Sequence, residues 1–226
     1  MKTVVFSLGG SVINPGQISR SYLASFAALI DKNVNKYKFV IVCGGGALAR
    51  QYIQACPDLG LTEGEKDQMG ILATWMNAKL LQLYLKSHTG PNLPKSIDLL
   101  LEQFQKYPVV VCGGFLPAIK TDEDAAIIAD LIGAGMIINI TDVDGIYDKD
   151  PKKHKDAKRI DQMTYNEFFD QFKTMDIGAG SKMPFTLLAT KVAERSNIPI
   201  IVCSKEIEVL NRVLAGESVG TTIKRT

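Results

Sequence analysis

The sequence has little histidine and little cysteine, which limits the metal and catalytic chemistry open to it. It contains two histidines, His88 and His154, and four cysteines, none of which forms a C-x-x-C pair. Both histidines lie far from every cysteine along the chain, which argues against a structural zinc site. So few histidines also disfavour a mechanism that depends on a histidine base. We expect the cysteines to be small buried thiols of a reducing compartment.

A large charge imbalance and a long apolar run are also absent. Lys and Arg total 26 against 24 Asp and Glu, and the resulting net charge of +2 is too small to indicate nucleic acid as the main partner. The longest apolar stretch, 125–140, is interrupted by Asp130, Gly133 and Gly135, and the first residues lack a signal-peptide pattern. We therefore expect a cytoplasmic globular protein that engages neither membrane nor nucleic acid.

Short β-branched runs alternate with helical patterns along the chain. We expect strands at 3–8, 38–43, 109–112, 136–140 and 200–202, an edge strand at 220–223, and helices at 18–32, 47–55, 65–86, 97–104, 123–132, 184–196 and 206–214. Such near-continuous apolar strands are typical of a sheet covered on both faces. The pattern predicts an α/β fold, a three-layer αβα sandwich with an open, mostly parallel central sheet. We interpret the charged segment 148–159 as a solvated loop, followed by a short helix capped by Thr164.

Glycine clusters follow three of the expected strands. They are Gly9-Gly10, Gly44-Gly45-Gly46 and Gly113-Gly114. Ligands of open parallel sheets bind outside the carboxyl ends of the strands, where glycine allows the backbone and its N–H groups to approach phosphate closely. One such cluster is equally well explained as a tight turn, but three together indicate a phosphate-rich ligand or two ligands that meet.

Two known phosphate motifs fit poorly. No G-x-x-x-x-G-K-[ST] occurs, since the segment from Gly178 to Lys182 lacks the spacing. Gly44-x-Gly46-x-x-Ala49 matches the dinucleotide fingerprint, but it follows the second expected strand, and the acidic residues some 20 positions later open a helix. A nicotinamide-dependent dehydrogenase therefore stays a minor alternative.

The segment ITDVDGIYDKDP, 140–151, carries the most specific pattern. An apolar strand delivers Thr141, Asp142, Asp144, Tyr147 and Asp150 within ten residues. Two carboxylates at a strand end can hold Mg²⁺ or order a lysine, and Tyr147 can pack on a base. The alternative is an Asp-Gly turn with no functional role.

Together these segments resemble the amino acid kinase superfamily, and within it the archaeal-type uridylate kinases. The resemblance covers the whole chain and rests on LGGSV (8–12), VCGGGALAR (42–50), EKDQMGI (65–71), CGG and TDEDAA (112–126), ITDVDGIYDKDP (140–151) and VGTTI (219–223). It implies a single domain over 1–226 with two lobes, an acceptor side at about 1–135 and an ATP side at about 136–226. It also implies transfer of the γ-phosphoryl group of ATP to UMP in a homohexamer.

The resemblance further implies roles for individual residues. The expected catalytic residues are Gly10, Asp142, Asp144 and Lys182. The expected ATP-binding residues are Gly9, Gly10, Ser11, Gly46, Arg50, Thr141, Tyr147 and Asp150. The expected acceptor-binding residues are Gly45, Asp67, Gly114, Phe115, Leu116, Pro117, Ala118, Ile119, Lys120 and Thr121. Mg²⁺ would be held through the ATP phosphates, with Asp144 as a further candidate ligand.

Three departures from the family pattern keep other functions open. Ser7 stands where many members have a lysine, residues 115–121 lack the usual histidines, and Asp142 replaces an asparagine. A kinase of this fold with another acceptor, such as a small carboxylate, a carbamate or an isoprenoid phosphate, is one alternative. A non-catalytic nucleotide-binding protein is another.

One stripe of the helix expected at 65–86 has two interpretations. It consists of Ile71, Leu72, Trp75, Met76, Leu80 and Leu83. Such a stripe is most often a core face, whereas the resemblance implies that part of it lies at a subunit interface.

Overall fold

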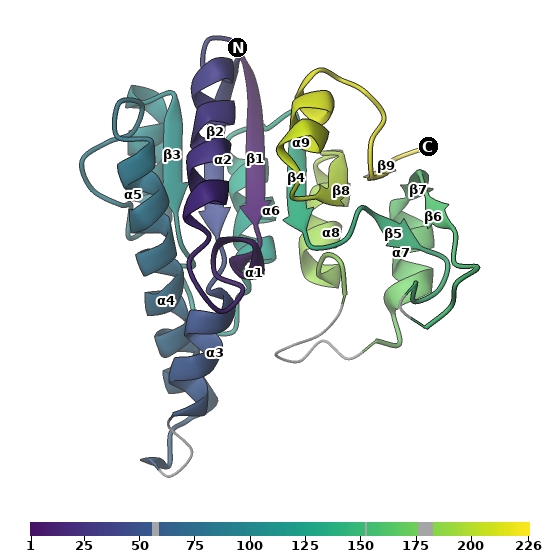
Figure 1. Ribbon diagram of the computed structural model, residues 1–226, viewed down its shortest axis with the longest axis horizontal. Coiled ribbons are helices and arrows are strands. Elements are labelled where there is room, and N and C mark those ends of the chain that lie inside the picture. Colours follow the sequence, from purple (N-terminus) through teal and green to yellow (C-terminus); the bar gives the residue numbers. More distant parts are fainter. Residues whose placement is uncertain (56–58, 152, 176–182) are drawn as a thin grey trace.

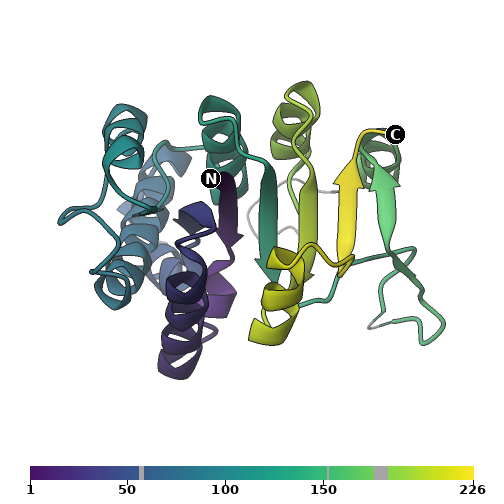
Figure 2. The same ribbon diagram turned by 90° about the horizontal axis from the view of Figure 1, so that it is seen from above.

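The computed structural model describes residues 1–55, 59–151, 153–175 and 183–226, which form one central sheet with helices on both faces (Figures 1 and 2). The strand order is β3-β2-β1-β4-β8-β9-β7. All neighbouring strands run parallel except β8 and β9. The strands are β1 (Lys2–Leu8), β2 (Tyr37–Cys43), β3 (Val109–Cys112), β4 (Met136–Thr141), β7 (Gln162–Thr164), β8 (Ile200–Ser204) and β9 (Thr221–Lys224). The predicted three-layer, mostly parallel architecture is confirmed.

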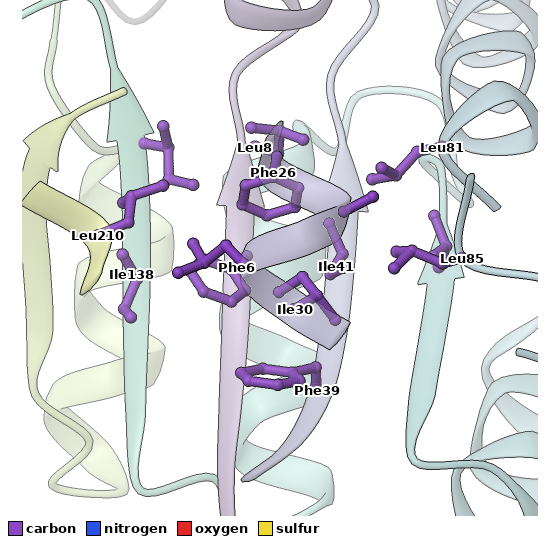
Figure 3. Close-up of a cluster of buried hydrophobic side chains, with 14 of the residues drawn as sticks. Phe6, Leu8, Phe26, Ile30, Phe39, Ile41, Leu81, Leu85, Ile138 and Leu210 are labelled. Carbon is purple, nitrogen blue, oxygen red and sulfur yellow. The ribbon is translucent and has the colours of Figure 1, made fainter. Parts of the chain in front are cut away.

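Alternate residues of the strands serve two separate cores. On one face, Phe6 of β1 packs edge-to-face on Phe26 at 5.5 Å between ring centroids and stacks on Phe39 at 5.7 Å (Figure 3). On the other face, Val5 joins a second cluster with Val40 and Ile137. Burial on both sides explains why these strands read as continuous apolar runs.

The helices divide between these two faces. The first face carries α2 (Arg20–Asn33), α4 (Glu63–Tyr84) and α9 (Ile207–Leu214). The second carries α5 (Ile97–Lys106), α6 (Thr121–Leu131), α7 (Tyr165–Phe172) and α8 (Leu187–Arg195). Seen from above, the dark purple α2 and yellow α9 lie on the opposite side of the sheet from the teal α6 and green α8 (Figure 2). Two short helices, α1 (Gly10–Ile13) and α3 (Gly46–Gln54), follow β1 and β2 directly.

The carboxyl-terminal part of the sheet differs from the prediction. The strand expected at 220–223 as an edge strand is β9, and it lies between β8 and β7, so its edge position was wrong. The true edge, β7, has only three residues, too few for a period-two pattern to emerge. Most of the charged segment lies between β5 (Ile146–Tyr147) and β6 (Arg159–Ile160). The described part of this stretch contains turns but neither a helix nor a strand. Thr164 caps α7 as expected, accepting the Glu167 N–H.

Half of the apolar stripe of α4 is exposed. Leu72, Met76 and Leu83 are 50, 60 and 55% exposed, respectively. The helix buries its neighbouring face more deeply, and that face combines Leu81 with small or polar residues such as Ala73 and Asn77. Ile71, Trp75 and Leu80 are half-buried, and Leu80 packs against the core, so the core interpretation is wrong for the three exposed residues only. A role of the stripe at a subunit interface stays a prediction. Within the described ranges, we find no helix that combines the length and apolar character needed to cross a bilayer.

Candidate active site

The loops that follow β1 and β2 contact each other backbone to backbone. A Cβ on Gly10 would lie 2.0 Å from the Gly46 nitrogen, and one on Gly46 would lie 2.2 Å from the Gly10 oxygen. Gly46 also has φ +63°, which disfavours any side chain. From the sequence, these glycines were expected to let a ligand approach the backbone. In the structure, the close contact between the two loops already requires glycine at both positions. It brings the start of α3, whose helix terminus favours anions, beside the Gly9-Gly10 loop.

The strand register places the predicted site residues at one edge of the sheet. Leu8 pairs with Cys43 of β2 and with Ile140 of β4, and Thr141 pairs with Ser204 of β8. Because these strands are parallel, the loops after them all emerge at the carboxyl edge, the lower end of β1 in Figure 1. The Gly9 N–H donates to the Ile140 oxygen at 3.3 Å, so the first glycine loop lies directly beside residues 141 and 142.

Asp67 contacts the predicted acceptor loop, although the two lie far apart in sequence. The Ala118 N–H donates to the Asp67 carboxylate at 2.7 Å. Ala118 adopts φ +63°, a left-handed conformation that is unusual for alanine. Leu116, Pro117 and Ala118 are exposed around this contact. The structure thus brings together two segments that the sequence assigned to the same ligand.

Three residues of α4 that sequence reasoning missed as site residues hold the glycine loops. The Asn77 amide donates to the Gly44 oxygen at 2.8 Å and to the Gly45 oxygen at 3.2 Å. Thr74 accepts the Gly114 N–H at 2.8 Å, and the Trp75 indole donates to the Gly114 oxygen at 2.8 Å. The available signal was polar Thr74 and Asn77 one turn apart on a long helix. Trp75 was assigned only to the apolar stripe.

A buried and a half-buried carboxyl lie next to the acceptor loop. Ser7, almost fully buried at the end of β1, donates to Asp122 at 2.7 Å. Burial raises the pKa of Asp122 to about 6, although the Ser7 hydrogen bond lowers it. Asp124, 3% exposed, accepts the Phe115 N–H at 3.3 Å, and burial raises its pKa to about 7. The acceptor side therefore contains acids that titrate close to neutral pH.

Beyond β4, the chain forms a turn that is organised by polar side chains. The Thr141 hydroxyl donates to the Val143 oxygen at 2.8 Å and accepts the Val143 N–H at 3.2 Å. Tyr147 donates to Asp144 at 2.7 Å, and Arg159 donates to the other Asp144 oxygen at 3.1 Å. Partial burial alone would raise the pKa of Asp144, but hydrogen bonds from Tyr147, its own backbone and Arg159 together hold it below the usual value.

The remaining predicted ATP-side residues take several positions. Asp142 forms an ion pair with Lys205 at 2.8 Å, a partner that sequence reasoning missed. Arg50 is exposed on α3, one helical turn from Gly46, so the two share a helix face. The backbone carbonyl oxygen of Asp150 accepts the N–H groups of Lys153 and His154. The predicted catalytic Lys182 lies outside the described residues.

Comparison with known proteins relates the whole chain to one family. Residues 2–204 match the amino acid kinase family. A uridylate kinase of Thermoplasma volcanium is 39% identical over 225 residues, which cover 99% of this chain and 98% of that relative. The crystal structure of uridylate kinase from Archaeoglobus fulgidus has a TM-score of 0.88 at 36% identity, covering 99% of this chain and all of that one. The UMP kinase of Bacillus anthracis gives a TM-score of 0.79 at 25% identity, over 99% of this chain and 96% of that one.

Proposed function

The chain belongs to the amino acid kinase family, and from this premise we propose the reaction that it catalyses. It is an enzyme that transfers the γ-phosphoryl group of ATP to UMP, giving ADP and UDP. The observation that carries this function is the full-length similarity to uridylate kinases of both sequence and fold. The contact between Asp67 and the loop at 115–121 adds local support. A nucleoside monophosphate carries a ribose and a phosphate, and we assign the ribose to Asp67 and the phosphate to this loop.

Within this reaction, an oxygen of the UMP phosphate attacks the γ-phosphorus, and the bond to the oxygen bridging to the β-phosphorus breaks. Such a transfer goes through a loose transition state, so the protein mainly positions two anions and neutralises their charge. We assign the backbone of Gly9, Gly10 and Gly46 to the phosphates. Their fixed contact supports this role, because a pre-organised backbone needs no rearrangement when charge develops.

We assign the two substrates to opposite parts of the sheet edge. The acceptor side, 1–135, contains β1, β2 and β3, with Gly45, Asp67, Gly114 and residues 115–121 proposed to bind UMP. The ATP side, 136–226, contains β4, β8, β9 and β7. We propose that Thr141, Tyr147 and Asp150 bind the adenine nucleotide there. Two further proposed ATP-binding residues, Ser11 and Arg50, belong to the first part of the chain. This division stays a prediction for every residue named.

We propose that Mg²⁺ enters with ATP, held chiefly by the phosphate oxygens. Mg²⁺ is typically bound through one or two carboxylates plus substrate phosphates. Across the described ranges there is no group of three or more His, Cys, Asp or Glu side chains that could hold a metal ion. Asp144 already accepts hydrogen bonds at both oxygens, so a direct bond to Mg²⁺ would have to displace Arg159 or Tyr147. We therefore give Asp144 the role of orienting Tyr147.

The exposed stripe of α4 supports an assembly of identical chains. A surface pocket of about 500 Å³ is lined by Tyr52, Met69, Leu72, Ala73, Trp75, Met76, Lys79 and Leu93. Apolar surface of this kind on a globular protein marks an interaction site. We propose that it is buried in a homo-oligomer, a hexamer built of dimers, in keeping with closed symmetry. Sedimentation at micromolar concentration should show a hexamer, and a monomer alone would refute the assembly.

The cytoplasm is the proposed location of the enzyme. The three described cysteines, Cys43, Cys112 and Cys203, are buried free thiols, as is usual in a reducing compartment.

A coupled assay of ADP release tests the reaction. The acceptors to compare are UMP, CMP, other nucleoside monophosphates, carbamate, small carboxylates and an isoprenoid monophosphate. We expect the largest kcat/KM with UMP. Turnover of another acceptor in preference to UMP would assign a different kinase reaction, and ATP binding without turnover of any acceptor would indicate a non-catalytic protein.

A further inference from the structure

Asp142 and Lys205 form an ion pair where two adjacent parallel strands end. Thr141 is the last residue of β4, Ser204 is the last of β8, and the two are partners in the strand register. Asp142 and Lys205 are the next residues of each strand, and their side chains meet at 2.8 Å between Oδ1 and Nζ. The side chains are 49% and 40% exposed, so the pair is accessible to a ligand at this edge.

The position of Lys205 brings its charge within reach of the glycine loop. Strand β4 lies between β1 and β8, and the Gly9 N–H donates to Ile140 of β4. Neighbouring strands lie about 4.8 Å apart, so the residue after β8 is roughly 10 Å from the loop after β1. The flexible four-carbon stem of a lysine covers much of that distance. From its place beside Asp142, the ammonium group is therefore within reach of a phosphate held by that loop.

A buried hydroxyl without a partner lies near the same pair. Among the described side chains, the Tyr22 oxygen is the buried polar atom that makes no hydrogen bond. Burial, Cys203, Glu206 and Asp142, in that order, raise the pKa of Tyr22, which places the hydroxyl in the electrostatic environment of Asp142. A buried donor without an acceptor is costly, so this part of the free protein holds one unsatisfied polar group.

We infer that Lys205 is a catalytic cation that contacts the ATP phosphates, and that Asp142 is the positioning residue that aims it. The inference rests on the proposed phosphoryl transfer and deepens it. The role is electrostatic, and no proton moves to or from Lys205 in it. As the bond between the γ-phosphorus and the bridging oxygen breaks and the new bond to UMP forms, the ammonium neutralises charge on the oxygens of the phosphates. Ser7, at the end of β1, is neutral and bound to Asp122, so it supplies no such charge.

The first test compares Lys205→Met with Lys205→Arg. We expect Lys205→Met to lower kcat by about 100-fold and to leave the KM for UMP within about twofold. The variant lacks the positive charge that stabilises the negative charge developing on the phosphates, so the transfer step slows while UMP binding is unaffected. It should also weaken ADP binding by about tenfold while adenosine binds as before, since only ADP carries the phosphates. Lys205→Arg should restore part of both losses. Lys106→Met is the matched control, because Lys106 forms an exposed ion pair with Glu102 on α5, away from this edge.

The second test asks whether Asp142 acts through Lys205. Asp142→Asn alone should lower kcat by about tenfold, but in the Lys205→Met background it should change kcat by less than about twofold, since residues that act as one unit are not additive. Full additivity would overturn the positioning role.

Equal weakening of ADP and adenosine binding, or an active Lys205→Met enzyme with normal ADP affinity, would overturn the role of Lys205. If the unaltered protein fails to phosphorylate UMP, the proposed function fails, and the comparison of ADP with adenosine still decides the role of Lys205.

Discussion

The sheet-edge loops of the proposed acceptor side and of the proposed ATP side are held by different interactions. On the acceptor side, α4 supplies neutral hydrogen-bond partners, Thr74, Trp75 and Asn77, to glycine loops whose backbone is mostly buried. On the ATP side, exposed ion pairs such as Asp142–Lys205 and Asp144–Arg159 organise the turn after β4. Buried neutral hydrogen bonds are insensitive to salt and costly to break, whereas exposed ion pairs each contribute about 0–1 kcal/mol.

This difference teaches how one sheet edge can serve two nucleotides. A pre-organised acceptor side needs little rearrangement to bind its ligand. The ATP side contains charged side chains that can exchange a protein partner for a phosphate oxygen, because their pairing in the free protein is weak. We therefore expect substitutions on the ATP side to affect catalysis first, and substitutions on the acceptor side to affect acceptor binding or stability.

The largest expected effect is that of Asp144→Asn on the ATP side. Loss of this charge should lower kcat by about 100-fold or more with the fold intact, because Asp144 holds both Tyr147 and Arg159 at the proposed ATP site and electrostatic positioning is typically worth that much. Steady-state kinetics with a circular dichroism check measures it. Asp161→Asn is the matched control, because Asp161 also pairs with Arg159, at 3.0 Å, but is not bonded to Tyr147 in the structure. Turnover close to normal in folded Asp144→Asn would remove the contrast between the two sides.

A smaller effect, confined to one substrate, is expected from Asp67→Ala on the acceptor side. It should raise the KM for UMP at least about tenfold and leave the KM for ATP nearly unchanged, because charge-assisted hydrogen bonds to a ribose contribute that much affinity. Asp67→Asn separates the two roles, since an amide oxygen can still accept the Ala118 N–H but carries no charge. Equal changes in both KM values would contradict the assignment of Asp67 to UMP.

Asn77→Ala tests whether α4 stabilises the acceptor side as argued. It leaves two carbonyl oxygens without their buried donor, so the free energy of unfolding should fall by at least about 1 kcal/mol. Urea denaturation followed by the fluorescence of Trp75, the single tryptophan, reports it. Gln103→Ala, which loses an exposed hydrogen bond to Asn92, should change stability by less than about 0.5 kcal/mol. A similar loss of stability in both variants would mean that the buried hydrogen bonds of Asn77 contribute no more than an exposed one.

A further expected effect is a pH dependence of stability that comes from the acceptor side. Burial raises the pKa of Asp124 to about 7, above its value in the unfolded chain, so the folded state holds this proton more tightly. The stability that this proton contributes is complete below about pH 4 and is lost as the pH rises through about 7. The free energy of unfolding, measured by urea denaturation at pH values from 4 to 8, should therefore change less with pH in Asp124→Asn than in the unaltered protein. An unchanged slope, matching that of the exposed control Asp98→Asn, would contradict this origin.

Much of the fold follows from local pattern. The strand at 109–112 was predicted with its bounds correct, and the others lie within a few residues of their predicted positions. A strand buried on both faces must be apolar at every position, so its sequence alone identifies it. The same holds for the segments after the strands, because parallel strands end at one edge and the glycine clusters had to meet there.

The tertiary structure alone decided which side chains meet. Lys205 and Asp142 are separated by 63 residues, and Ser7 and Asp122 by 115, so no local pattern relates them. The stripe of α4 shows the same limit, since periodicity reveals an apolar face but not whether the sheet or another chain covers it. Sequence determines elements through interactions between near neighbours. A functional site depends on how those elements pack, because packing alone sets the distances between residues remote in the chain.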